Sequence, residues 1–220
     1  WEHPSRGLLY PLEFISLAEE TGLIFPLPHW ILRESCRQLQ NWQRRFRENA
    51  ELRISVNISS KMLLQQGFVD TVASILKAEG LQPGVLALEI TESVLMEHTN
   101  AALDAMLQLQ NMGVHIHIDD FGTGYSSLSY LHAFPVNALK IDRSFIAKLS
   151  ASGDDSEIVR TIITLAQNLH LEVIAEGVEL NHQLSTIRDL DCQYGQGFLF
   201  SKPLSPADMD AWVDAHNSTT

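Results

Sequence analysis

The feature that most constrains this chain is a repeated pattern, in which a short β-branched run ending in polar residues precedes a segment with helical periodicity. The runs are 53-RISVNIS-59, 85-VLALEIT-91, 114-VHIHIDDFG-122, 138-ALKID-142, 172-EVIAEGV-178 and 194-YGQGFLF-200. The helical segments between them include Phe68–Glu79, Thr99–Met112, Glu157–Leu169 and His182–Leu190. This alternation predicts βαβ units and a parallel sheet, closed as a barrel or open and doubly wound.

Side-chain parity within the runs favours the barrel. In the first run Ile54 and Val56 share one face of the predicted strand, while Ser55 and Asn57 share the other. The next three runs repeat this division into an apolar face and a small or polar face. A doubly wound sheet buries both faces, whereas a barrel can direct a polar face to the mouth formed by the C-terminal strand ends. A complete barrel of this kind has eight strands, so about two are expected to be missing before Trp1.

Composition narrows the possible partners. The 220 residues carry a net charge of −12. This charge predicts no DNA partner, because affinity for duplexes comes largely from Lys and Arg. An anionic substrate would need positive charge from elsewhere, and a divalent metal is the obvious source. No apolar stretch approaches the ~20 residues of a membrane span and no signal peptide is visible. With only Cys36 and Cys192 as thiols, we expect a reducing, cytoplasmic setting.

Polar residues gather at the ends of the predicted strands. They are Asn57, Glu89, Asp119, Asp120, Lys140, Asp142, Glu176 and Gln196. Carboxylate and amide oxygens suit Mg²⁺, Mn²⁺ or Ca²⁺, and crowded carboxylates would repel one another without such ions. Two divalent ions bridged by an acid, for which the adjacent Asp119 and Asp120 are suited, predict phosphodiester hydrolysis.

Each of these residues also has a plainer interpretation. A single acid at a strand end often caps a helix, and Glu92 and Glu179 could simply begin helices. Lys140 could form a structural ion pair with Asp142 or another nearby acid.

The chain resembles the EAL domain family, bacterial phosphodiesterases that hydrolyse cyclic di-GMP. The matching segments follow the family's order and spacing over nearly the whole chain: 13-EFISLAEETGLI-24, 54-ISVNIS-59, 89-EITES-93, 119-DDFGTGYSSLSYL-131, 139-LKIDRSFI-146, 175-AEGVE-179 and 196-QGFLFSKPL-204. The resemblance implies an α/β fold, a (β/α)₈ TIM-like barrel whose first strand and most of whose second strand are absent from this chain. The domain would span residues 1–217, with a tail at 218–220.

The resemblance also implies two metal ions, Mg²⁺ or Mn²⁺, and roles for the strand-end residues. One ion would be held by Asn57, Glu89, Asp119 and the glutamate of the motif that names the family, and the second by Asp119, Asp120 and Glu176. Lys140 would orient the attacking water and contact the phosphate. Gln196, Glu92, Asp142 and Glu179 would bind substrate or support the ligands, Glu92 by holding the loop after Asp120. The product would be linear pGpG.

Several further expectations follow from the resemblance. The protein would be a homodimer through the loop after Asp120, fused to sensory or diguanylate-cyclase-like domains. The glutamate that names the family and a substrate-binding arginine would precede Trp1, so the chain alone is expected to be impaired. His115 and His117 form a His-x-His-x-Asp series typical of metal ligands, but we expect both to pack inside the barrel.

Two other functions remain open at this point. The domain could bind cyclic di-GMP as an inactive receptor, although such a receptor has no need of Lys140 and the acids around it. It could also be an unrelated metal-dependent TIM-barrel hydrolase.

Overall fold

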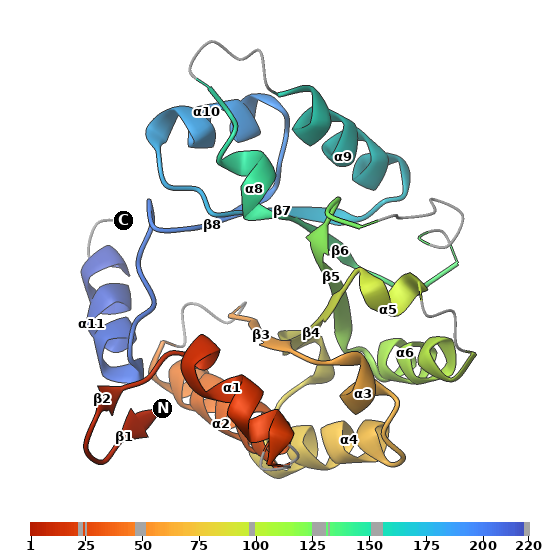
Figure 1. Cartoon of the computed structure of the whole chain (residues 1–220), viewed down its shortest axis with the longest axis vertical. Helices are drawn as coiled ribbons and strands as arrows, with labels where there is room; N and C mark the ends of the chain where they lie inside the picture. The colour runs from red at the N-terminus through yellow and green to blue at the C-terminus, as the bar shows by residue number, and fades with distance from the viewer. Residues whose placement is uncertain are drawn as a thin grey trace.

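One curled sheet of six parallel strands forms the centre of the molecule (Figure 1). The computed structural model describes residues 1–21, 24, 26–46, 52–96, 100–124, 131, 133–150 and 156–217. The strands are β3 (Ile54–Asn57), β4 (Leu86–Thr91), β5 (His115–Phe121), β6 (Ala138–Ile141), β7 (Glu172–Glu176) and β8 (Tyr194–Gln196), each paired with the next. All six predicted strands are therefore present. β8 is shorter than the run 194–200 because the chain turns after Gln196, where Phe200 N donates to Gly197 O at 3.1 Å.

Helices surround the outer side of the curl (Figure 1). They are α1 (Pro11–Glu20), α2 (Leu27–Arg45), α3 (Ser60–Leu63), α4 (Phe68–Glu79), α5 (Ser93–Met96), α6 (Asn100–Met112), α8 (Arg143–Ile146), α9 (Glu157–Asn168), α10 (Asn181–Asp189) and α11 (Pro206–Asn217), with a 3₁₀ turn at Pro83–Val85. The four helical segments predicted from periodicity are α4, α6, α9 and α10. A short antiparallel pair, β1 (Glu2–His3) and β2 (Gly7–Leu8), precedes α1. None of the described helices has the length and apolar character to cross a membrane.

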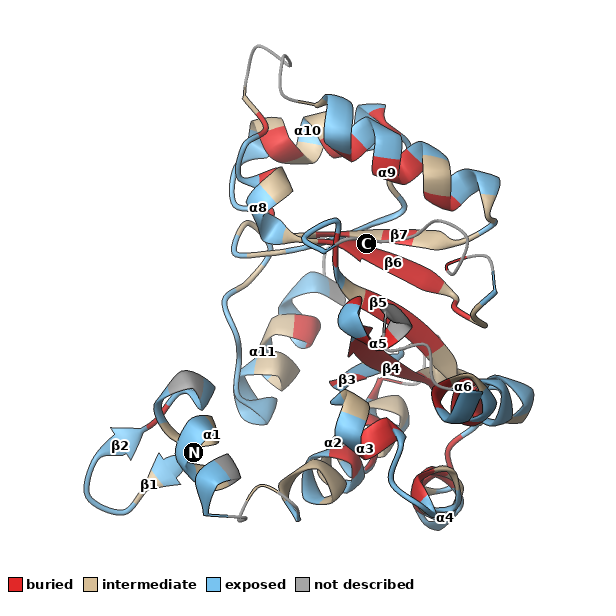
Figure 2. Ribbon diagram, turned by 45° about the vertical axis from the view of Figure 1, so that its right-hand side comes forward, coloured by how far each residue is buried: buried red, intermediate tan, exposed pale blue. Residues whose placement is uncertain are grey.

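The two-face division predicted for the first four strands agrees with their burial, whereas all three residues of the last strand, β8, are exposed. The outward side chains of the central strands β4, β5 and β6 are almost completely buried, and Figure 2 shows these strands coloured mostly as buried. These side chains include Leu86, Leu88, Ile90, Ile116, Ile118, Leu139 and Ile141, none more than 1% exposed. Burial of such apolar faces is the main favourable term in folding, and it leaves the other face of these strands to the interior of the curl.

The sheet is open between β3 and β8. In the described part of the chain, β3 pairs only with β4 and β8 only with β7. The inward residues Asn57 and Gln196 on these two edge strands are exposed. The curl of six strands is the corresponding part of a TIM-like barrel, and its mouth is formed mainly by the four inner strands.

The C-terminal helix α11 is tied to α2 rather than to a strand. Trp42 Nε1 donates to Asp210 Oδ1 at 2.8 Å, and Arg45 forms ion pairs with Asp210 and Asp214. These contacts join the beginning of the chain to its end, beside the open side of the sheet (Figure 1).

Candidate active site

A compact group of charged side chains lies at the C-terminal ends of the inner strands. Lys140 Nζ on β6 lies 2.6 Å from Glu89 Oε2 on β4, 2.6 Å from Glu176 Oε1 on β7 and 3.1 Å from Asp119 Oδ1 on β5. Glu89 is 6% exposed and Lys140 is 3% exposed. Parallel strands bring their carboxyl ends to one edge, so four separate runs of sequence meet at a single ammonium. We call these four residues and Asp120 the acidic cluster.

An irregularity in β5 brings the adjacent residues Asp119 and Asp120 to the same side. Successive side chains on a regular strand face opposite ways. Here the register with β6 shifts between Ile118 and Phe121, as in a β-bulge, and Asp120 has a left-handed φ of 54°. Asp120 can therefore join Asp119 at the mouth, while Phe121 returns to the buried outer face.

Three carboxylates of the cluster are close enough to share a cation. Asp119, Asp120 and Glu176 each offer an oxygen, and these oxygens lie within 4.8 Å of one another. A donor set of carboxylate oxygens fits Mg²⁺ or Mn²⁺ better than softer metals. The residues present therefore fit the metal chemistry that the sequence predicts at this place.

The electrostatics of the cluster point the same way. Burial, followed by the charges of Asp119 and Asp142, raises the pKa of Asp120. Burial also raises the pKa of Glu176, although Lys140 opposes that rise. Burial alone would lower the pKa of Lys140. The nearby carboxylates of Glu89 and Glu176 have the larger effect, and the pKa of Lys140 is raised. One lysine thus does not balance the surrounding negative charge, and a divalent cation would relieve the excess.

Glu92 holds the beginning of the loop that follows Asp120. It is 3% exposed, and its Oε2 accepts a hydrogen bond from Gly122 N at 2.9 Å. A Cβ at Gly124 would lie 2.6 Å from Glu92 Oε1, and Gly122 has φ 95°. The close approach at Gly124 and the positive φ of Gly122 both favour glycine at these positions. Residues 125–130 lie outside the described part of the chain, and so does the dimer contact expected for this loop.

Among the described residues, none of the remaining predicted side chains forms a hydrogen bond or ion pair with the cluster, although Asn57 lies opposite Glu89 and Gln196 opposite Glu176 in the strand register. Asn57 and Gln196 are exposed on the edge strands, and Glu179 is exposed beyond β7. Asp142 Oδ1 accepts from Ser144 N at 3.0 Å and caps α8. Lys140 therefore forms no ion pair with Asp142, which caps its own helix. It does pair with other nearby acids, Glu89, Asp119 and Glu176, which the plainer interpretation of the sequence also allowed.

His117 lies inside the curl, directly opposite Glu89 in the register between β4 and β5. It is 6% exposed, and burial, followed by His115 and Lys140, lowers its pKa to about 4. Neither ring nitrogen has a hydrogen-bond partner among the described residues. The predicted packing of this ring inside the barrel agrees with its burial, and the ring is neutral at physiological pH.

A polar contact that the sequence did not predict crosses the opposite end of the curl. Arg53 Nη1 lies 3.7 Å from Glu172 Oε2, and Tyr194 Oη donates to Glu172 Oε1 at 3.5 Å. Arg53 precedes β3 while Glu172 begins β7, so the contact depends on the curvature of the whole sheet. The sequence offered one hint of this contact, because Arg53 and Glu172 are each the first inward-facing polar residue of their predicted strand.

Comparison with known proteins places this site in a family. The EAL domain model matches residues 1–203. The chain is 44% identical over 216 residues to cyclic di-GMP phosphodiesterase NbdA of Pseudomonas aeruginosa, covering 98% of this chain and 27% of that protein. It is 39% identical over 212 residues to cyclic di-GMP phosphodiesterase PdeR of Escherichia coli, covering 96% of this chain and 32% of that protein. The chain thus spans about a quarter to a third of the length of these relatives.

A solved structure agrees with the sequence comparison. The phosphodiesterase of PaMucR, in its cyclic di-GMP complex, matches with a TM-score of 0.88 and 44% identity, over 95% of this chain and 84% of that one. The family model, the curated relatives and this fold agree with one another, and the chain belongs to the EAL domain family.

Proposed function

We propose that this chain is a catalytic domain that hydrolyses cyclic di-GMP to linear pGpG with two Mg²⁺ or Mn²⁺ ions. The observation that carries the proposal is the acidic cluster, in which Asp119, Asp120 and Glu176 offer oxygens within 4.8 Å of one another. Two relatives named cyclic di-GMP phosphodiesterases support the substrate. Asp119, Asp120 and Glu176 would hold one ion, and Asn57, Glu89 and Asp119 the other.

The reaction adds water across one phosphodiester bond. The hydroxyl group joins phosphorus, the proton goes to the leaving 3′ oxygen, and the product is a linear dinucleotide with a 5′ phosphate. When bound, the divalent ions supply activation of the water and neutralisation of phosphate charge. The carboxylates hold the ions in place, and Glu92 fixes the loop after Asp120 against the cluster.

Lys140 contributes a charge that is already in position. Its ammonium is buried and held by three carboxylates from three other strands, β4, β5 and β7. A fixed positive charge in a water-poor site stabilises negative charge that builds up on phosphate oxygens in the transition state. Gln196, Asp142 and Glu179 would assist from the rim by binding substrate or by supporting the residues that hold the ions.

Other parts of the proposal concern the whole protein. We propose a cytoplasmic homodimer that forms through the loop after Asp120 and is fused to sensory or diguanylate-cyclase-like domains. The fusion is supported by a relative whose name gives it two activities, the bifunctional diguanylate cyclase/cyclic di-GMP phosphodiesterase MucR of Pseudomonas aeruginosa. This chain is 45% identical to it over 204 residues. The free thiols of Cys36 and Cys192 agree with a reducing compartment.

The test combines product analysis with a metal-binding measurement on the protein as its natural gene encodes it. The wild type should release pGpG from cyclic di-GMP with Mg²⁺ or Mn²⁺, and Mn²⁺ should raise its Tm by binding the folded state. Asp119→Asn should remove most of both effects, while the same change at exposed Asp104 on α6 should remove neither. Binding of cyclic di-GMP without any product in the wild type would instead identify a receptor.

A further inference from the structure

A buried amide on α10 joins two of the segments that follow the inner strands. Gln183 lies in the first turn of α10 and is 4% exposed. Its Oε1 accepts from Glu179 N at 2.8 Å and from Leu180 N at 2.9 Å, and its Nε2 donates to Ile146 O at 3.1 Å. Gln183 therefore connects the turn after β7, residues 177–180, with the last residue of α8.

Only part of this arrangement is ordinary helix capping. A glutamine at the third position of a helix commonly accepts from the backbone N–H just before the helix, and the contact with Leu180 N is of that kind. The contact with Ile146 O joins residues 37 apart in the sequence and belongs to no cap. An amide can make both contacts because it combines an acceptor with donors. A carboxylate could keep only the contacts with the turn, and an apolar side chain could keep neither.

Both segments that Gln183 joins follow strands of the acidic cluster. The helix α8 begins three residues after Lys140 of β6, and the turn begins directly after Glu176 of β7. Lys140 Nζ and Glu176 Oε1 are themselves 2.6 Å apart. Within the described part of the chain, Gln183 forms no hydrogen bond with a side chain of the cluster. Its influence on the cluster therefore passes through the turn and α8.

The turn after β7 is in close contact with its other neighbours. A Cβ at Gly177 would lie 2.6 Å from the Cβ of Arg143, so the turn lies directly against α8. Val178 N donates to Gln196 O at 3.0 Å, which joins the turn to the end of β8. A displacement of this turn would move the carboxylate that immediately precedes it, that of Glu176.

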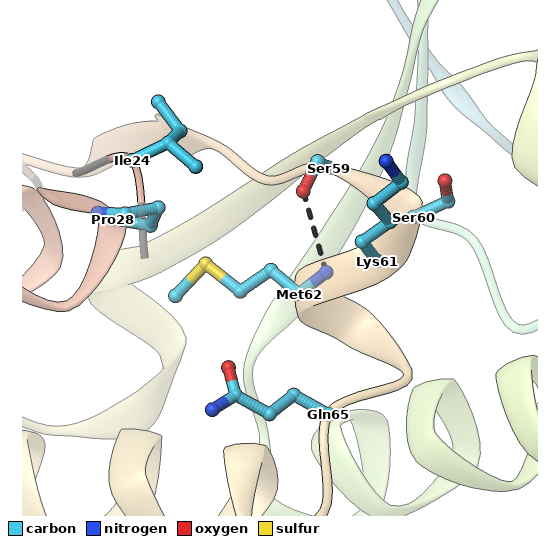
Figure 3. A pocket seen from close by; sticks show the side chains of 7 residues that line it. All are labelled: Ile24, Pro28, Ser59, Ser60, Lys61, Met62 and Gln65. Atoms are coloured by element: carbon cyan, nitrogen blue, oxygen red, sulfur yellow. Dashed lines mark hydrogen bonds between the residues drawn. The ribbon is translucent and has the colours of Figure 1, made fainter. Parts of the chain in front are cut away.

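The segment after the edge strand β3 is held in a different way. Ser59 Oγ accepts from Met62 N at 3.3 Å, a contact within the first turn of α3 (Figure 3). This cap is local, whereas the amide of Gln183 spans two segments that follow different strands. The long-range contact lies beside the buried part of the site, and the local contact lies beside the exposed Asn57.

We propose that Gln183 is a positioning residue for the metal site. It holds the turn after β7 against α8 and thereby keeps the Glu176 carboxylate where it can share a cation with Asp119 and Asp120. The inference rests on the proposed function, since that function requires the cation. Gln183 itself contacts neither substrate nor reacting atoms. Replacement of such supporting residues typically costs about 10–100-fold in metal affinity or activity.

Equilibrium binding of Mn²⁺ without substrate, followed by electron paramagnetic resonance of the free ion, tests this on the protein as its natural gene encodes it. Gln183→Met keeps the length of the side chain but removes its hydrogen bonds, and should weaken Mn²⁺ binding about 10–100-fold. Gln183→Glu should lose less affinity, because a carboxylate still accepts from the turn. The control Ile163→Ala, at a 2% exposed position of α9, should lower the Tm and leave the Mn²⁺ affinity unchanged.

The measurements are made below the lowest Tm of the set, so that every variant is folded. Equal Mn²⁺ affinity in the wild type and Gln183→Met would overturn the inference. So would an equal loss in Ile163→Ala and Gln183→Met, because the loss would then follow stability rather than position. If Gln183→Met does not fold, a Gln183→Glu variant that binds Mn²⁺ as tightly as the wild type would overturn it. Failure of the wild type to bind Mn²⁺ or to cleave cyclic di-GMP would overturn the proposed function instead.

Discussion

The inner strands and the edge strands carry predicted site residues in very different states. On β4 to β7, Glu89, Lys140 and Glu176 are buried or half-buried and joined at 2.6 Å. On β3 and β8, Asn57 and Gln196 are exposed. Strand alternation places all five side chains on the inward face of the sheet. Among the described residues, however, only the side chains on strands paired on both sides form ion pairs with one another. Position within the sheet, as well as the face of the strand, therefore decides how well a site residue is preorganised.

The largest effect is expected from removing the ammonium at the centre of the inner strands. Lys140→Ala should lower kcat on cyclic di-GMP about 10²–10³-fold while KM changes little, because a preorganised charge acts mainly on the transition state. Lys140→Arg should not restore activity, since a planar guanidinium cannot replace a compact ammonium. Steady-state kinetics below the melting temperature measures this.

The control for that experiment is Lys148→Ala on the exposed side of the Phe145 ring, which should retain kcat. Cyclic di-GMP should still bind to Lys140→Ala when Ca²⁺ replaces Mg²⁺. A variant that keeps its kcat and only melts earlier would show that Lys140 is a structural ion-pair partner.

Acid should destabilise the inner strands through His117. Its folded pKa of about 4 lies below the ordinary value near 6.5, so the unfolded chain binds the proton more readily. The stabilising contribution is complete above about pH 6.5 and is lost as the pH falls toward 4, by on the order of 3 kcal/mol. His117→Leu should lack this loss. Urea unfolding at pH 7 and pH 4.5 measures the difference, and an identical acid loss in both proteins would contradict the assignment.

The turn after β7 should tolerate no side chain at Gly177. This glycine has φ 70°, and a Cβ there would lie 2.6 Å from the Cβ of Arg143. Gly177→Ala should therefore lower the free energy of unfolding by about 1–3 kcal/mol. Gly67→Ala is the matched control, because Gly67 has φ 81° with open space around it and should cost about 1 kcal/mol from backbone strain alone. Arg143→Gly should recover part of the loss in the double variant; no recovery would exclude the clash.

The smallest effect on stability is expected at the edges. Asn57→Ala and Gln196→Ala should each change the free energy of unfolding by no more than about 0.5 kcal/mol, as is usual for exposed side chains. Glu89→Ala should cost several times more, because it leaves the buried Lys140 with one partner fewer. Chemical denaturation of the three variants tests the comparison directly, and similar losses at all three positions would remove it.

Sequence predicted the strands and their two faces because both depend on local alternation. It also placed Glu89, Asp119, Lys140 and Glu176 at the same edge, since parallel strands share their carboxyl ends. It could not identify Glu89 as the partner of Lys140, because β4 and β6 meet there only through the curvature of the sheet. The capping role of Asp142 and the pairing of Arg53 with Glu172 likewise depend on dihedral angles and distances that spacing does not encode.

The bulge in β5 has a consequence for how this site can gain or lose a ligand. Ile118 and Phe121 both face the helices, opposite Leu139 and Ile141, with two residues between them where regular alternation has one. Deletion of Asp120 would give a regular strand, with Phe121 in the same apolar environment and one carboxylate fewer at the mouth. Insertion or deletion of a single codon at this point would thus change the number of carboxylates at the mouth. The residues on either side would still face the same way, inward or outward, as before.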